Sequence, residues 1–172
     1  MNWQQISKYH RVDLGFEKNL NLVLETIEDP TWRNKYDRGY FLFLIRDVLQ
    51  RQIIEKAFLT SWTIWEQIFA LENTSWLSED EIFRMSGDRK IAYGLTTYFD
   101  VKLTKVGWKN VKRMTRSRNR LTHYGKIGDV SIKEKRMFIE LTEQLVAKTL
   151  GLTPSNALNT REYVEEFLAK TD

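Results

Sequence analysis

Turn-forming residues are scarce in this sequence, which contains eight glycines and two prolines among 172 residues. An antiparallel sandwich or barrel needs a turn about every ten residues, and glycine and proline supply many of those turns. The sequence therefore favours an all-α fold. A chain of this length suits one domain, and folding should remove roughly 70% of the extended chain's surface from water, which is enough for a full hydrophobic core.

Composition narrows the class of protein further. The hydrophobic fraction of 42% and the charged fraction of 29% are typical of a soluble globular protein. The absence of cysteine excludes disulfides, thiolate metal sites and cysteine nucleophiles. The first ten residues lack the charged-then-apolar pattern of a signal peptide, and the longest apolar run, residues 41–45, ends at Arg46. We expect a soluble, cytoplasmic protein with no membrane segment.

The pattern predicts one long core helix from Tyr36 to Glu72, with no glycine or proline after Gly39. Its apolar residues are too many for a single stripe on a surface helix, so it must be covered on two sides. One cover is the domain's own core. The second is either another helix of the same chain or the same helix in a partner subunit, and the latter would make the protein a homodimer.

The chain divides into an N-terminal extension of uncertain structure, residues 1–35, and a helical domain, residues 36–172. Within the extension, the segments HRVDLGF and LNLVLETI suit a small hairpin, although the second also suits a short helix. Ser78 with Glu81 and Ser131 with Glu134 form two capping boxes, each of which opens a helix. Further helices are expected over Arg89 to Phe99, from Lys105 or Trp108 to Tyr124, from Ser131 to Leu150, and over Thr160 to Lys170.

Positive charge is concentrated in one segment, although the net charge is only +4. Between Val101 and Gly128 there are nine lysines or arginines and no acid, while the rest of the chain holds 18 basic and 23 acidic residues. A cationic segment on a mildly acidic body is what a site for a polyanion looks like in a sequence. The alternative is a basic helix face that only meets solvent.

Most conventional catalytic machinery is missing. Two histidines without cysteine cannot form a usual zinc site, and neither a glycine-rich phosphate loop nor a GxSxG elbow is present. Composition leaves open a Mg²⁺ site made of carboxylates alone, but no acidic pair has a context that suggests one, and we expect no metal and no cofactor. The first of the two histidines, His10, lies in a terminal segment of uncertain structure and is more typical of a surface residue than of a catalyst.

The end of the basic helix is the exception. On a helical wheel Arg118 falls on the core-facing stripe, and a buried guanidinium needs an anion, either an acid of the fold, a ligand's phosphate, or both in turn. Glu66 is a suitable partner, because it lies on the apolar stripe of the long helix, an unusual place for an acid. A separate face brings together Lys112, Arg116, Asn119 and His123.

The motif Arg118-Asn119-x-x-x-His123, late in an all-helical chain, resembles that of the HEPN domains (higher eukaryotes and prokaryotes nucleotide-binding). The resemblance covers about Tyr36 to Leu150. It implies a HEPN-like helical bundle and a metal-independent endoribonuclease of the kind found in toxin–antitoxin, abortive-infection and CRISPR systems. It also implies a homodimer that brings two motifs to one cleft, and it suggests an antitoxin protein as a partner. Tyr124 departs from the family pattern, in which many members have glycine directly after the histidine.

The resemblance assigns roles to the motif. His123 would act as base or acid, Arg118 would stabilise charge on the phosphate, and Asn119 would orient His123 or a phosphate oxygen. Independently of the resemblance, a Glu66–Arg118 pair would either hold the fold together or support Arg118 in this role. The RNA backbone would meet the basic residues of the segment, which are Lys109, Lys112, Arg113, Arg116, Arg120 and Lys126.

Two other functions compete with the ribonuclease. One is a catalytically silent HEPN-like module that binds RNA, a nucleotide or a protein through the same face. The other is a helical interaction protein whose basic helix docks an acidic partner. In both, Arg118 is a structural ion-pair residue and His123 is a helix-terminal residue stabilised by the helix dipole.

Overall fold

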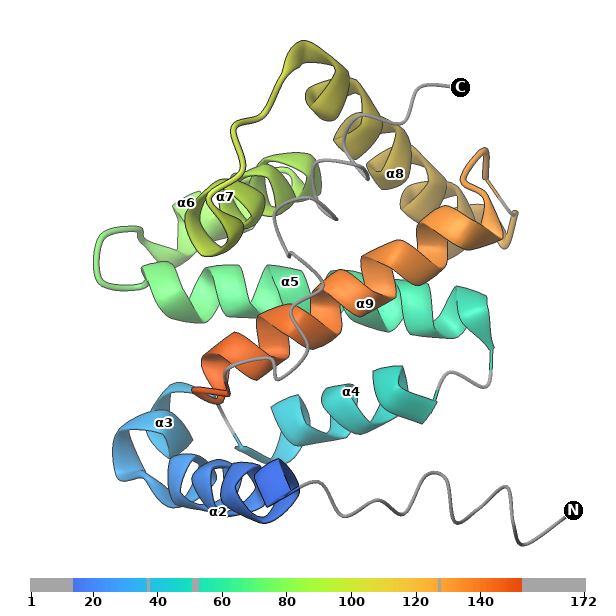
Figure 1. Cartoon of the computed structure of the whole chain (residues 1–172). Helices are drawn as coiled ribbons and strands as arrows, with labels where there is room; N and C mark the ends of the chain where they lie inside the picture. The colour runs from blue at the N-terminus through green and yellow to red at the C-terminus, as the bar shows by residue number, and fades with distance from the viewer. Residues whose placement is uncertain (1–13, 37, 51–52, 127, 153–172) are drawn as a thin grey trace, which may run out of the picture.

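The computed structural model describes residues 14–36, 38–50, 53–126 and 128–152. These residues form eight α-helices and no strand, which confirms the all-α prediction (Figure 1). The helices are α2 (Leu14–Glu28), α3 (Pro30–Lys35), α4 (Arg38–Gln50), α5 (Ile54–Asn73), α6 (Glu79–Arg84), α7 (Gly87–Phe99), α8 (Lys105–Tyr124) and α9 (Ile132–Thr149).

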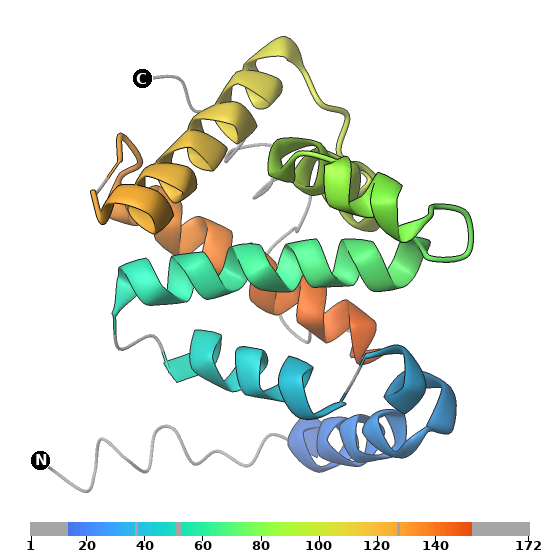
Figure 2. The same cartoon turned by 180° about the vertical axis from the view of Figure 1, so that it is seen from behind.

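The predicted long core helix is confirmed as α5, but its predicted bounds were wrong, because the segment from Tyr36 to Glu72 contains two helices, α4 and α5. Ile53, just before α5, has an extended backbone (φ −128°, ψ 116°), and α4 folds back along α5 (Figures 1 and 2). Each helix buries part of the other's apolar surface. The second cover is therefore a helix of the same chain, and the apolar surface of this segment no longer argues for a dimer.

The hairpin expected in the N-terminal extension is also wrong where the structure describes it. Residues 14–28 form α2, because Leu22, Val23, Thr26 and Ile27 recur at helical spacing and are half-buried on one face. The next helix, α3, brings Trp32 into the core, where its indole Nε1 donates to the Thr149 carbonyl at 3.0 Å. The end of the extension therefore packs against the end of α9.

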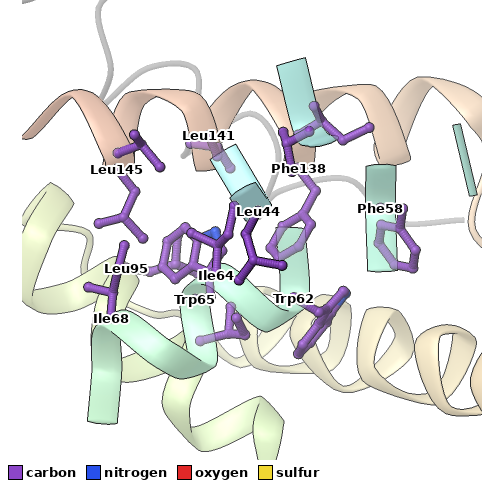
Figure 3. Packing of buried hydrophobic residues seen from close by; sticks show 14 of the residues in the cluster. Leu44, Phe58, Trp62, Ile64, Trp65, Ile68, Leu95, Phe138, Leu141 and Leu145 are labelled. Atoms are coloured by element: carbon purple, nitrogen blue, oxygen red, sulfur yellow. The ribbon is translucent and has the colours of Figure 1, made fainter. Parts of the chain in front are cut away.

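The core lies where α9 crosses α5. Figure 3 shows Phe138 of α9 between Trp62 and Trp65 of α5, with ring-centroid distances of 5.2 Å and 5.9 Å respectively. All three side chains are at least 98% buried. Burying one large apolar side chain contributes about 1.5–3 kcal/mol, so this crossing is a major source of stability.

Two glycines let α7 approach α5 closely. A Cβ atom at Gly94 would lie 2.6 Å from Cζ3 of Trp65, which no real contact allows. A Cβ atom at Gly87 would lie 3.0 Å from Oε1 of Glu66 and 3.4 Å from Cζ3 of Trp62. The two glycines are seven residues apart, about two helical turns, so both face α5.

Helix α5 also carries three glutamates, each paired with a cation from a different helix. The pairs are Glu55 with Lys135 at 3.1 Å, Glu66 with Arg118 at 3.3 Å, and Glu72 with Lys35 at 2.6 Å. Through these pairs α5 is joined to α9, α8 and α3. The middle pair is the one predicted from the sequence.

The remaining helix predictions agree with the structure to within two residues. Both capping boxes form, at Ser78 with Glu81 and at Ser131 with Glu134. The helix predicted over 160–170 lies outside the described residues. Among the residues described, no helix has the length and apolar character needed to cross a membrane.

Candidate functional site

Helix α8 carries the candidate site, and its ends are defined by two caps. At its start, Thr104 Oγ1 accepts a hydrogen bond from the Gly107 amide at 3.1 Å. At its end, Gly125 adopts the left-handed conformation (φ 60°), which closes the helix directly after Tyr124. His123 is therefore helical, as the grouping of Lys112, Arg116, Asn119 and His123 on one face requires.

The core-facing stripe of α8 includes a partly exposed arginine. Gly107, Val111 and Met114 are buried, whereas 26% of the Arg118 side chain is exposed. One guanidinium nitrogen donates to Oε2 of Glu66 at 3.3 Å, and another donates to Oδ1 of Asn119 at 3.1 Å. The predicted contact between Glu66 and Arg118 is confirmed, but the predicted burial of the pair is wrong, because 26% of the Arg118 side chain and 29% of the Glu66 side chain are exposed.

Arg118 keeps capacity for a further anion. A guanidinium has five N–H donors, of which the contacts with Glu66 and Asn119 use two. The contact with Glu66 restricts the position of the side chain without closing it off from solvent. An arginine that is held in place and still accessible suits recognition of a phosphate.

The outer face of α8 meets solvent. All four residues of this face are exposed, namely Lys112, Arg116, Asn119 and His123. The imidazole of His123 lies edge-on to the ring of Tyr124, with 6.3 Å between the ring centroids. Arg118 and His123 are five residues apart, about 7.5 Å along the helix axis. Five residues also turn the two side chains about 140° apart around the axis, so a ligand that meets both must reach across the end of α8.

The loop after α8 is fastened back onto the helix. Arg113 forms an ion pair with Glu134 and donates to the Asp129 carbonyl at 3.1 Å. Burial pushes the pKa of Glu134 up, but hydrogen bonds from Arg113 and Ser131 outweigh it and hold that pKa below its ordinary value. Arg113, which the sequence groups with the RNA-binding residues, is thus turned toward the loop and start of α9.

Gly128 fixes the same loop by close contact. A Cβ atom at this position would lie 2.7 Å from the Cα atom of the buried Ser117, so only glycine fits without a shift of the backbone. The loop that follows His123 therefore takes its position from the packing of Gly128 on α8.

The other predicted RNA-binding residues lie on the surface. Lys109, Lys112, Arg116 and Lys126 are exposed. Arg120 lies 3.4 Å from Asp129, and both side chains are more than half exposed, so this ion pair contributes little stability. Arg120 can exchange such a partner for a phosphate at small cost.

Comparisons of this chain with protein-family models, with curated proteins and with solved structures found no match.

No group of three or more histidine, aspartate or glutamate side chains that could hold a metal ion occurs among the described residues.

Tyr124 has an exposed position that the sequence analysis did not assign to the site, because it noted this residue only as a departure from the family pattern. Tyr124 is 73% exposed directly beside His123, where its ring is available to a base or another flat group. The signal for this position was an aromatic residue immediately before the helix-ending glycine.

Proposed function

We propose that this protein is a metal-independent endoribonuclease of HEPN type that cleaves RNA through Arg118, Asn119 and His123. One observation carries the proposal. Arg118 is held 3.3 Å from Glu66 while a quarter of its side chain stays open to solvent, at the same helix end as the exposed His123. A fixed guanidinium and an accessible imidazole are the two groups that cleavage without a metal needs.

The chemistry is an internal transfer within RNA. A base removes the proton of a ribose 2′-hydroxyl, the 2′-oxygen attacks the adjacent phosphorus, and the bond from phosphorus to the 5′-oxygen breaks. An acid gives the leaving oxygen its proton, so the products end in a 2′,3′-cyclic phosphate and a 5′-hydroxyl. His123 supplies one of these proton transfers, which typically contributes 10²–10⁴ in rate. Arg118 stabilises the charge that develops on the phosphate.

One histidine provides one of the two proton transfers, so the proposal includes a homodimer that brings a second His123 to the same phosphate. This part rests on the resemblance, because α4 and α5 bury their apolar faces on each other. Light scattering at micromolar concentration should report twice the mass of the 20.6 kDa chain. A monomer that cleaves RNA would show that one chain is sufficient. An antitoxin protein remains part of the proposal as a partner.

A catalytically silent module is the second candidate, and the arrangement of α5 favours it. Glu66–Arg118 is one of three glutamate–cation pairs that join α5 to its neighbours. In this reading Arg118 holds α8 in place, and the exposed cations of α8 bind RNA without cleaving it.

Cleavage in EDTA separates the two candidates. Purified protein should cut mixed RNA in the presence of EDTA and leave 2′,3′-cyclic phosphate ends. His123→Ala and Arg118→Ala should each lower the rate at least about a hundredfold. His10→Ala is the matched control, because His10 is the other of the two histidines, and it should cleave like the wild type. Full activity of His123→Ala would refute the proposed chemistry, and RNA binding without cleavage by the wild type would favour the silent module.

A further inference from the structure

A cavity of about 620 Å³ opens between the start of α7 and the first half of α8, two helices that pack side by side (Figures 1 and 2). Three of its lining residues are cations, one is an acid and one is a tryptophan. The lining consists of Arg84, Ser86, Asp88, Arg89, Trp108 and Lys112. The cavity thus combines an excess of positive charge with a flat aromatic ring.

The charged groups of this cavity are available to a ligand. Arg84, Arg89 and Lys112 are exposed, and Trp108 is half-buried. Arg84 approaches Asp80 only to 4.0 Å with both side chains over 80% exposed, so that ion pair contributes little. Asp88 lies in the first turn of α7, where an acid stabilises the helix dipole. An anion would therefore sit toward the three cations and away from Asp88.

The cation and the ring are placed together. Lys112 is one turn after Trp108 on α8, and its Nζ lies 5.9 Å from the centre of the Trp108 ring. A ligand that carries an anion next to a flat group can meet both residues at once. An acidic peptide would satisfy the cations but would leave the indole face unused.

The start of α7, which lines this cavity, also lies against the residue that positions Arg118. Ser86 and Asp88 flank Gly87, which lies against Glu66, the residue that holds Arg118. Trp108 precedes Arg118 by ten residues, about 15 Å along α8. A strand bound along this side of α8 would pass from the cavity to Arg118.

We propose that the cavity binds one nucleotide of the RNA substrate, at a position along the strand away from the cleaved bond. The base of this nucleotide would stack on Trp108, and Arg84, Arg89 and Lys112 would hold its phosphate. The inference rests on the proposed function in taking RNA as the ligand of α8. Stacking on an aromatic side chain accepts every base, so this subsite contributes affinity and register with little sequence preference. Phosphate contacts add the salt-dependent part of the affinity.

Binding of an RNA analogue that cannot be cut tests the subsite apart from catalysis. A fluorescent 2′-O-methyl oligouridine lacks the attacking hydroxyl, and its affinity can be measured by fluorescence anisotropy. Trp108→Leu should weaken binding of this oligomer about tenfold and leave binding of an abasic oligomer of the same length unchanged. Trp108→Phe should restore most of the affinity. Trp76→Leu, which removes an exposed tryptophan before α6, is the matched control.

The charge contribution needs its own variants. Arg84→Gln with Arg89→Gln should weaken both oligomers equally and flatten the dependence of affinity on salt, because these residues would contact phosphates. Arg33→Gln on α3 removes an exposed arginine at the other end of the molecule and should change nothing. Circular dichroism would verify that each variant is folded.

The outcomes separate the subsite from the ribonuclease. Equal weakening of both oligomers by Trp108→Leu, or no weakening of either, overturns the stacking role. Failure of the wild type to bind either oligomer, with binding of an acidic peptide instead, overturns RNA as the ligand. Binding that depends on Trp108 in a protein that cuts no RNA supports the subsite and refutes the ribonuclease. Cleavage that depends on His123, together with normal RNA binding by Trp108→Leu, supports the ribonuclease and refutes the subsite.

Discussion

The guanidinium of Arg118 and the carboxylate of Glu66 lie 3.3 Å apart, although 52 residues separate them in the chain. Arg118 comes from the solvent-facing helix α8 and Glu66 from the central helix α5. The proposed catalytic arginine is therefore positioned by the same helix that carries Trp62 and Trp65 of the core.

Removing the charge of Glu66 should disturb Arg118 more than it disturbs the fold. Glu66→Gln keeps a hydrogen-bond acceptor, and the pair is partly exposed, so the free energy of unfolding should fall by about 1 kcal/mol or less. The rate of RNA cleavage should fall about tenfold through kcat, because the guanidinium is less well placed in the transition state. Glu25→Gln on α2 is the control for loss of an exposed acid. An unchanged kcat would show that Glu66 only stabilises the fold.

The exposed cations of α8 should bind phosphates without reading bases. Replacing Lys109 and Arg116 together with glutamine should weaken single-stranded RNA binding and lower the slope of log affinity against log salt by about 1.4, at about 0.7 for each lost phosphate contact. Arg136→Gln on α9, an exposed arginine outside this face, serves as the comparison. If affinity is the same at low and high salt in the wild type, the basic face only meets solvent.

Periodicity and capping residues were sufficient to predict most helices, because both are local properties of the chain. The serine–glutamate boxes at Ser78 and Ser131 begin helices where expected, and Glu66 was predicted from one acid on an apolar stripe. The break near Ile53 was missed because neither glycine nor proline marks it. It exists because folding α4 against α5 buries two apolar faces, a gain that only tertiary packing supplies.

The cavity beside α8 could not be predicted from the sequence. Trp108 and Lys112 share α8, and their spacing was visible in the sequence, but Arg84 is the last residue of α6 and Arg89 lies in the first turn of α7. Only the packing of α7 on α8 brings those arginines to the tryptophan. Similarly, the spacing that placed Arg113 among RNA-binding residues did not reveal that Glu134 lies against it.

Gly128→Ala should displace the loop that follows His123. The added Cβ would lie 2.7 Å from the Cα atom of Ser117, and backbone on both sides limits how far either can yield. We expect a loss of about 1–3 kcal/mol in the free energy of unfolding, measured with urea. Gly125→Asn is the matched change, because asparagine tolerates the positive φ and open space surrounds that position. A Gly128 variant as stable as the wild type would contradict the close packing of this loop.

Lys135 makes the stability of the fold depend on Glu55. The Lys135 side chain is only 2% exposed, and Glu55→Gln would leave its charge without a carboxylate, which should cost about 3–5 kcal/mol. Replacing both residues, Glu55→Gln with Lys135→Met, should recover much of that loss because no buried charge is left. Urea unfolding at pH 7 measures both. A Glu55→Gln variant of wild-type stability would show that Lys135 finds another anion.

The Glu55–Lys135 pair also determines how the free energy of unfolding changes with pH. The hydrogen bond from Lys135 holds the pKa of Glu55 below its ordinary value of 4.5, despite the opposing effect of burial. The contribution of Glu55 to the free energy of unfolding is fully present above the ordinary pKa of a glutamate. It is lost as the pH falls through the lowered pKa of Glu55 in the folded protein. Stability should therefore drop on acidification below about pH 4.5, and by less in the double variant than in the wild type. Equal slopes in the two proteins would contradict this assignment.

The two glycines that face α5 have a consequence for how the sequence can vary. Helices α5 and α7 can approach closely because glycine has no side chain. At Gly94 even the Cβ atom of alanine would collide with the ring of Trp65. A library of variants selected for activity should keep glycine there as strictly as it keeps arginine at 118, although Gly94 touches no part of the site. Any larger residue would push α7 outward and carry Arg89 away from Trp108. The positions that tolerate no substitution should therefore include those that keep α5 and α7 close together, as well as the residues proposed to act on RNA.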